Sequence, residues 1–149
     1  EYDLIFTSPN SDTHSNIILR KINSYIENNK QRAIFITSLG RFDYLHLMKY
    51  SSGVIGNSSS GIIEAPALNI PSVNIGNRQN GRPQSKSVFQ SNLLYKSITK
   101  AIASMKSYKA KQTKCKPKYR GKHTVEKIVQ ILKDTDLTSI KFKKFRDIK

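Results

Sequence analysis

The 149-residue chain is poor in cysteine and histidine, and it has no tryptophan. A single cysteine, Cys115, excludes an internal disulfide framework and any zinc site built from several cysteines. The three histidines have no metal-ligand spacing: they are His14, His46 and His123. We therefore expect no metal and no cofactor, and the scarcity of cysteine favours a reduced, cytoplasmic compartment.

Long apolar runs are also missing. No stretch approaches the ~20 apolar residues of a membrane-spanning helix, and no basic segment followed by an apolar one opens the chain as in a signal peptide. Hydrophobic residues make up 37% of the sequence, which suits a packed domain better than a disordered tail. Because the chain lacks an initiator Met and its apolar run starts at Leu4, we expect one domain of a longer protein, without membrane contact.

Acidic residues are too few to balance the basic ones, and the formal net charge is +16. The excess is uneven, with net +3 in residues 1–95 and net +13 in residues 96–149. Clustered lysine neutralises phosphate, so a nucleic-acid-binding module is one alternative. Arginine is scarce in the basic third, however, and no nucleic-acid-binding motif is present. We favour a solvated, lysine-rich surface and expect no nucleic acid partner.

Short apolar runs alternate with segments of helical periodicity. The pattern predicts strands at residues 4–7, 33–36, 53–56, 72–75 and 87–89, and helices at 13–29, 42–50, 62–68, 93–106 and 124–133. This alternation is typical of an α/β fold, a three-layer α/β/α Rossmann-like domain with a parallel sheet. Ligands of such sheets bind outside the carboxyl ends of the strands. That rule selects the loops that begin at Ser8, Thr37, Gly56 and Gly76.

The loop at residues 56–61, Gly-Asn-Ser-Ser-Ser-Gly, is the most informative of the four. Its small residues let the backbone approach a ligand closely, and its hydroxyls add donors to the free N–H groups of the helix predicted to follow. That combination favours a phosphate or a diphosphate. The ordinary alternative is that Ser58–Ser60 only cap the helix.

Charged residues near this loop extend the same hypothesis. Glu64 lies early in the predicted helix, where an acid can complement the helix dipole or accept hydrogen bonds from two vicinal hydroxyls of a ribose. Arg78 and Arg82 lie in a glycine-bounded loop at the same predicted sheet edge, where arginines are natural counter-charges to a diphosphate.

Several motifs in order resemble the hydrolysing UDP-N-acetylglucosamine 2-epimerases of sialic acid biosynthesis. They are Ser-Pro-Asn-Ser-Asp-Thr at 8–13, Ser-Leu-Gly-Arg at 38–41, Gly-Asn-Ser-Ser-Ser-Gly-Ile-Ile-Glu-Ala-Pro at 56–66, and Pro-Ser-Val-Asn-Ile-Gly-Asn-Arg-Gln-x-Gly-Arg at 71–82. Segments at 119–124 and 143–148 also resemble the end of that family. The resemblance covers essentially the whole chain and implies the C-terminal half of a two-domain GT-B fold.

Carried over residue by residue, the resemblance implies a UDP site. Ser58 and Ser59 would hold the diphosphate, Glu64 the ribose hydroxyls, and Arg78 the phosphate side. Asn10 and Asp12 would face the cleft, and the backbone of Leu39, Gly40 and Arg41 would cradle the uracil. Where the family usually has Gly, this chain has His14, which can reshape the sugar side of the cleft.

The implied reaction removes the C2 proton of UDP-N-acetylglucosamine and eliminates UDP. Hydration of the resulting glucal then releases N-acetylmannosamine. The main acid/base carboxylates would lie in an N-terminal domain that this chain lacks, so the isolated fragment would be inactive. Arg78 would stabilise the leaving group, and the complete enzyme would be a homo-oligomer. The alternatives are a related epimerase acting on a UDP-diacetamido-trideoxy-hexose and a GT-B glycosyltransferase domain.

Two regions follow from this interpretation. Residues 1–134 would form the UDP-binding domain, and residues 135–149 a helical tail that packs on the N-terminal domain. In the tail, Phe142, Phe145 and Ile148 recur at three-residue spacing among lysines, as expected for an amphipathic helix.

Overall fold

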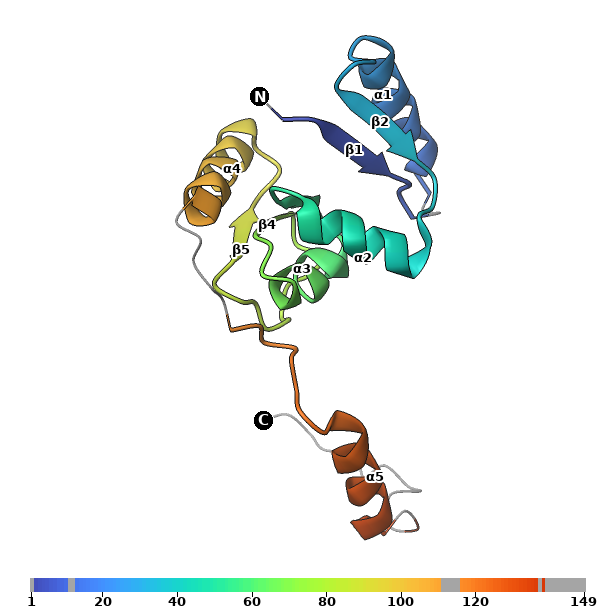
Figure 1. The fold of residues 1–149 in the computed structure, drawn as a ribbon, viewed down its shortest axis with the longest axis vertical. Coiled ribbons are helices and arrows are strands. Elements are labelled where there is room, and N and C mark those ends of the chain that lie inside the picture. The colour runs from blue at the N-terminus through green and yellow to red at the C-terminus, as the bar shows by residue number, and fades with distance from the viewer. Residues whose placement is uncertain (1, 11–12, 111–115, 137, 139–149) are drawn as a thin grey trace, which may run out of the picture.

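The computed structural model describes residues 2–10, 13–110, 116–136 and 138, and they form an α/β structure (Figure 1). Strands and helices alternate along the chain as the apolar pattern predicts. The elements are β1 (Leu4–Thr7), α1 (Ser15–Glu27), β2 (Ala33–Ile36), α2 (Gly40–Tyr50), β3 (Val54–Gly56), the 3₁₀ helix η1 (Ser59–Gly61), α3 (Glu64–Ala67), β4 (Ser72–Ile75), β5 (Val88–Ser91), α4 (Tyr95–Ala110) and α5 (Thr124–Asp134).

The strands form two parallel sheets. β1 pairs with β2, with Leu4 opposite Ala33, and a second sheet has the strand order β3-β4-β5. The predicted parallel pairing is confirmed, but the strands do not make one continuous sheet. β3 is three residues long and pairs with β4, so its other edge offers few groups for a further strand. The part of the chain around β1 contacts the part around the second sheet through Lys106. Its ammonium group lies 4.9 Å from the centroid of the Tyr2 ring, just before β1.

Helices cover both faces of the β3–β5 sheet, which explains why β4 is buried throughout most of its length. On one face, Val73 of β4 packs with Ala101 and Met105 of α4. On the other, Met48 of α2 packs with two residues around α3, Ala65 and Ile70. Figure 1 shows α4 on one side of β4 and β5, with α2 and α3 on the other. This part of the chain therefore has the predicted three-layer arrangement.

α1 lies against β2, and the ring of Tyr25 meets that of Phe6 edge-on at 5.8 Å between centroids. Apolar side chains of these elements stay partly exposed, among them Ile17, Ile18 and Ile34. The β1–β2 unit is consequently less buried than the three-layer part of the molecule.

α5 lies apart from both sheets, beyond an extended segment (Figure 1). Its apolar residues are exposed: Val125, Ile128, Val129, Ile131 and Leu132. The helix ends at Asp134, where the sequence places the boundary between domain and tail. The tail residues Phe142, Phe145 and Ile148 lie outside the described residues, so the domain division stays a prediction. Among the described helices, none is long and apolar enough to cross a bilayer.

Candidate functional site

The serine loop, residues 57–61, follows β3 and is held in a short 3₁₀ turn. The Ser58 Oγ accepts a hydrogen bond from the Ser60 backbone N–H at 3.4 Å. At the other end of the loop, the Ser72 hydroxyl of β4 donates to the Gly61 carbonyl. Ser58 is therefore a cap, as the ordinary alternative expects. Its exposed position also leaves the hydroxyl accessible to a ligand.

The helix predicted at residues 62–68 is wrong in its extent. The chain instead forms η1, a turn at residues 62–63, and the four-residue helix α3. Pro66 explains the interruption, because it has no N–H to donate to the Ile62 carbonyl four residues earlier. Asn69 then ends the segment in the left-handed conformation, at φ 60°. With so few helical residues, the dipole contributes little, and individual hydroxyl and N–H groups are the donors of this loop.

A hydrogen-bonded chain fixes the serine loop to α2. The Tyr44 hydroxyl lies 2.7 Å from the Ser60 Oγ, which in turn donates to the Ser58 Oγ at 3.3 Å. Ser60 is buried, so its hydroxyl points into the protein rather than toward a ligand. The last serine of the motif thus has a structural role, which leaves Ser58 and Ser59 as the two that can face a bound group.

Replacing Tyr44 with phenylalanine should lower the free energy of unfolding by about 1 kcal/mol. The substitution keeps the ring but leaves the buried Ser60 hydroxyl without this partner. Denaturant unfolding measures the change, and Tyr50→Phe is the matched control because Tyr50 lies on the same helix with 79% of its surface exposed. Equal stability of the two variants would show that the Tyr44–Ser60 contact contributes nothing.

Glu64 begins α3, and its carboxylate is partly buried. Its Oε2 atom has no solvent contact and no hydrogen-bond partner among the described residues. A buried acceptor without a partner costs free energy, and an atom that is closed to water is also closed to a ligand hydroxyl in this conformation. The role of Glu64 as an acceptor for ribose hydroxyls therefore stays a prediction.

The arginine loop, residues 76–82, leaves the carboxyl end of β4. Gly76 and Gly81 adopt φ of 81° and 78°, a region that side-chain-bearing residues rarely occupy. Gln90 of β5 donates from Nε2 to the Gly76 carbonyl at 2.5 Å, and its Oε1 accepts from Asn74 at 2.7 Å. The start of the loop is therefore anchored to two strands.

Arg78 and Asn10 meet across the two sheets. When the Asn10 amide is assigned so that its oxygen faces the guanidinium, this oxygen accepts from Nη2 of Arg78 at 2.7 Å and from Nη1 at 3.3 Å. The rule that ligands bind at the carboxyl ends of parallel strands selected both of these loops, although β1 and β4 belong to separate sheets. Arg82 is exposed in the same loop.

The remaining predicted residues lie at the ends of β1 and β2. Asp12 lies outside the described residues. His14 precedes α1, is exposed, and makes no capping hydrogen bond with its side chain. α2 begins at Gly40, two residues earlier than predicted, so Leu39, Gly40 and Arg41 form its first turn. The structure connects this helix to the serine loop through Tyr44.

Sequence patterns gave no role to two residues of this region, Tyr44 and Gln79. Both form contacts between residues that are far apart in the chain, namely with Ser60 and with Asn57. The available signal was weak: a tyrosine at helical spacing and a glutamine next to Arg78. Buried polar residues are frequent here, and they comprise Ser60, Ser72, Asn74, Gln79, Ser85, Ser87 and Ser91.

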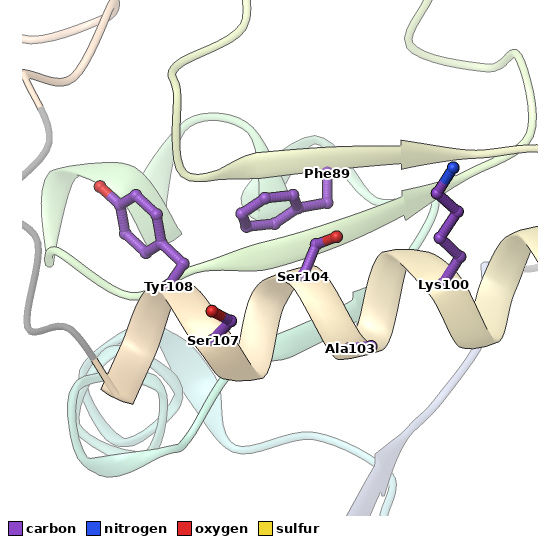
Figure 2. Close-up of a pocket in the computed structure, with 6 residues that line it drawn as sticks. All are labelled: Phe89, Lys100, Ala103, Ser104, Ser107 and Tyr108. Atoms are coloured by element: carbon purple, nitrogen blue, oxygen red, sulfur yellow. The ribbon is translucent and has the colours of Figure 1, made fainter.

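A hollow of about 440 Å³ lies elsewhere, between α4 and β5. Figure 2 shows its lining, with Phe89 of β5 facing Lys100, Ser104 and Tyr108 of α4. α4 follows the carboxyl end of β5, so its later residues lead away from the serine and arginine loops. No cluster of three or more His, Cys, Asp or Glu residues that could hold a metal ion occurs in the described part of the chain.

The fold and the site define a Rossmann-like α/β domain. Its serine loop and its arginine loop both lie at the carboxyl ends of parallel strands. Residues 1–133 match the UDP-N-acetylglucosamine 2-epimerase family, and the chain belongs to that family. The suspected resemblance and the fold class are thereby confirmed.

Three curated relatives illustrate the range of that family. The chain is 47% identical over 87 residues to polysialic acid biosynthesis protein P7 of Escherichia coli, covering 58% of this chain and 22% of the relative. It is 35% identical over 137 residues to UDP-N,N'-diacetylbacillosamine 2-epimerase (hydrolyzing) of Legionella pneumophila, covering 91% and 35%. It is 37% identical over 101 residues to UDP-N-acetylglucosamine 2-epimerase of Neisseria meningitidis, covering 67% and 26%. The chain thus spans about a fifth to a third of the length of these relatives.

Proposed function

We propose that this chain is the UDP-binding part of a hydrolysing UDP-N-acetylglucosamine 2-epimerase. The observation that carries the proposal is the contact between Asn10 and Arg78, which joins two loops at the carboxyl edge. An anion-binding guanidinium at this edge suits a nucleotide diphosphate. Membership of the epimerase family supports the choice of a sugar nucleotide.

Each loop binds the part of the nucleotide that matches its chemistry. Ser58 and Ser59 donate to the diphosphate together with Arg78. Glu64, at the start of α3, accepts from the ribose hydroxyls. The first turn of α2, from Leu39 to Arg41, receives the uracil.

The reaction begins with removal of the C2 proton and cleavage of the C1–O bond, so that UDP leaves with the bonding electrons. Water then adds across the double bond of the glucal, which inverts C2 and gives N-acetylmannosamine. The share of this chain is to stabilise the departing UDP, on which negative charge grows. The proposal includes a cytoplasmic, homo-oligomeric enzyme whose acid/base carboxylates belong to another domain.

Titration of the folded chain with UDP tests this site by NMR. We expect weak binding, in the millimolar range, with shifts concentrated at Ser58, Ser59, Glu64 and Arg78. Glu64→Ala should weaken UDP binding while leaving the affinity for inorganic pyrophosphate unchanged, because pyrophosphate has no ribose. A folded sample without any UDP-dependent shift at millimolar concentration would refute the site.

One relative favours a second substrate. The Legionella pneumophila protein, which matches 91% of this chain, is named for UDP-N,N'-diacetylbacillosamine. A full-length enzyme offered both sugar nucleotides separately would distinguish the two by their kcat/KM values. Sugar transfer to an acceptor in the same assay would instead indicate a glycosyltransferase.

A further inference from the structure

Gln79 is a buried polar residue that the proposed nucleotide site does not use. Only 3% of its surface is exposed, although it follows the exposed Arg78 directly in the arginine loop. Its Nε2 donates to the Asn57 backbone carbonyl at 2.8 Å. Its Oε1 is buried without a hydrogen-bond partner among the described residues.

This hydrogen bond joins the two loops that would hold the diphosphate. Asn57 directly precedes Ser58, and Gln79 directly follows Arg78. Each loop is also attached to its own surroundings: Gly76 to Gln90 and Ser60 to Tyr44. Among the side-chain hydrogen bonds of the described residues, the Gln79–Asn57 bond is the one that connects the serine loop to the arginine loop.

The unpartnered oxygen indicates that Gln79 is not optimised for stability alone. A buried acceptor left without a partner costs free energy, whereas an apolar side chain of similar size would avoid that cost. Buried polar groups without a hydrogen-bond partner lower stability, and they are expected mainly at functional sites. The amide group is retained here for the bond that its nitrogen makes.

We infer that Gln79 is a positioning residue that sets the spacing between the serine loop and Arg78, so that both reach the same diphosphate. The inference rests on the proposed UDP site and deepens it. Gln79 acts through Asn57 and Arg78 and does not contact the nucleotide itself. Substituting Gln79 should therefore weaken the binding of ligands that carry a diphosphate and leave ligands without phosphate unaffected. The reason is that the hydrogen-bond donors of the two loops bind one diphosphate well only while the distance between the loops is fixed.

The test compares UDP with uridine on the full chain. In Gln79→Met, which keeps the side-chain volume, we expect the affinity for UDP to fall about tenfold and the affinity for uridine to stay unchanged. Asn80→Leu is the matched control, since it removes an exposed amide from the same loop. Gln79→Asn provides a second variant, because it stays polar but is too short to reach the Asn57 carbonyl, and it serves if the methionine variant fails to fold.

The outcomes separate this inference from the proposed function. A wild-type chain that does not discriminate UDP from uridine overturns the UDP site, and the inference with it. A wild-type chain that prefers UDP, beside Gln79 variants with the same preference, overturns the inference alone. Equal losses for UDP and uridine also overturn it, because they indicate a general structural role. A loss confined to UDP, absent from Asn80→Leu, supports it.

Discussion

Replacing Arg78 with alanine is expected to lower kcat about a hundredfold in an enzyme that contains this chain, with a much smaller change in KM. In a bound UDP-sugar, the distal phosphate is esterified to the sugar, and its negative charge grows as the C1–O bond breaks. A guanidinium there interacts more strongly with the transition state than with the ground state, and only that difference accelerates the step. Loss of one such contact costs on the order of 3 kcal/mol.

The contact with Asn10 is consistent with a role of Arg78 in stabilising the leaving group. Asn10 holds the guanidinium with a neutral amide oxygen, and no ion pair between Arg78 and a carboxylate is found among the residues that the structure describes. An amide oxygen orients a guanidinium without cancelling its positive charge, which suits a group that binds a diphosphate.

Steady-state kinetics would check the Arg78 prediction, with Lys86→Ala as the control for removing one exposed positive charge away from the site, because Lys86 precedes β5 at the amino edge of the sheet. Ser59→Ala removes a neutral donor and should cost less, about 1 kcal/mol. An Arg78→Ala enzyme with unchanged kcat and only a raised KM would show that Arg78 binds both states equally.

Apolar periodicity predicted the alternation of strands and helices well, because buried runs and amphipathic spacing are local properties. β1, β2 and β4 have their predicted bounds. The segment after the serine loop was predicted less well because Pro66, placed inside an apolar run, removes a bond that the spacing takes for granted. The division into two sheets also escaped prediction, since it depends on which strand edges meet rather than on any one strand.

The topological rule selected the loops that hold Asn10, Asn57, Arg78 and Gln79, but it predicted no contact between individual side chains. Tyr44 and Ser60 are 16 residues apart, and Gln79 and Asn57 are 22 apart. Such pairs depend on the relative placement of whole elements, which single-sequence patterns do not encode. The roles of Ser58, Ser59 and Glu64 in binding stay predictions that the titration tests.

Ile62→Ala is expected to destabilise the chain by about 3 kcal/mol, the largest stability effect we predict. Ile62 is fully buried, with 0% of its surface exposed, directly after η1. Truncation removes buried methyl and methylene groups and leaves a cavity that the close-packed surroundings refill only in part. For a chain of this length, a loss of that size lowers the melting temperature by roughly 10 °C.

Ile55→Ala is the matched control, because Ile55 lies on β3, just before the serine loop, and 47% of its surface is exposed. Thermal unfolding should show a change of less than about 1 kcal/mol for this variant, since much of its side chain already contacts water. The comparison also tests whether the segment after η1 anchors the serine loop. If Ile62→Ala destabilises the chain no more than Ile55→Ala, the segment after η1 does not anchor the loop, and the loop's position then depends on its hydrogen bonds alone.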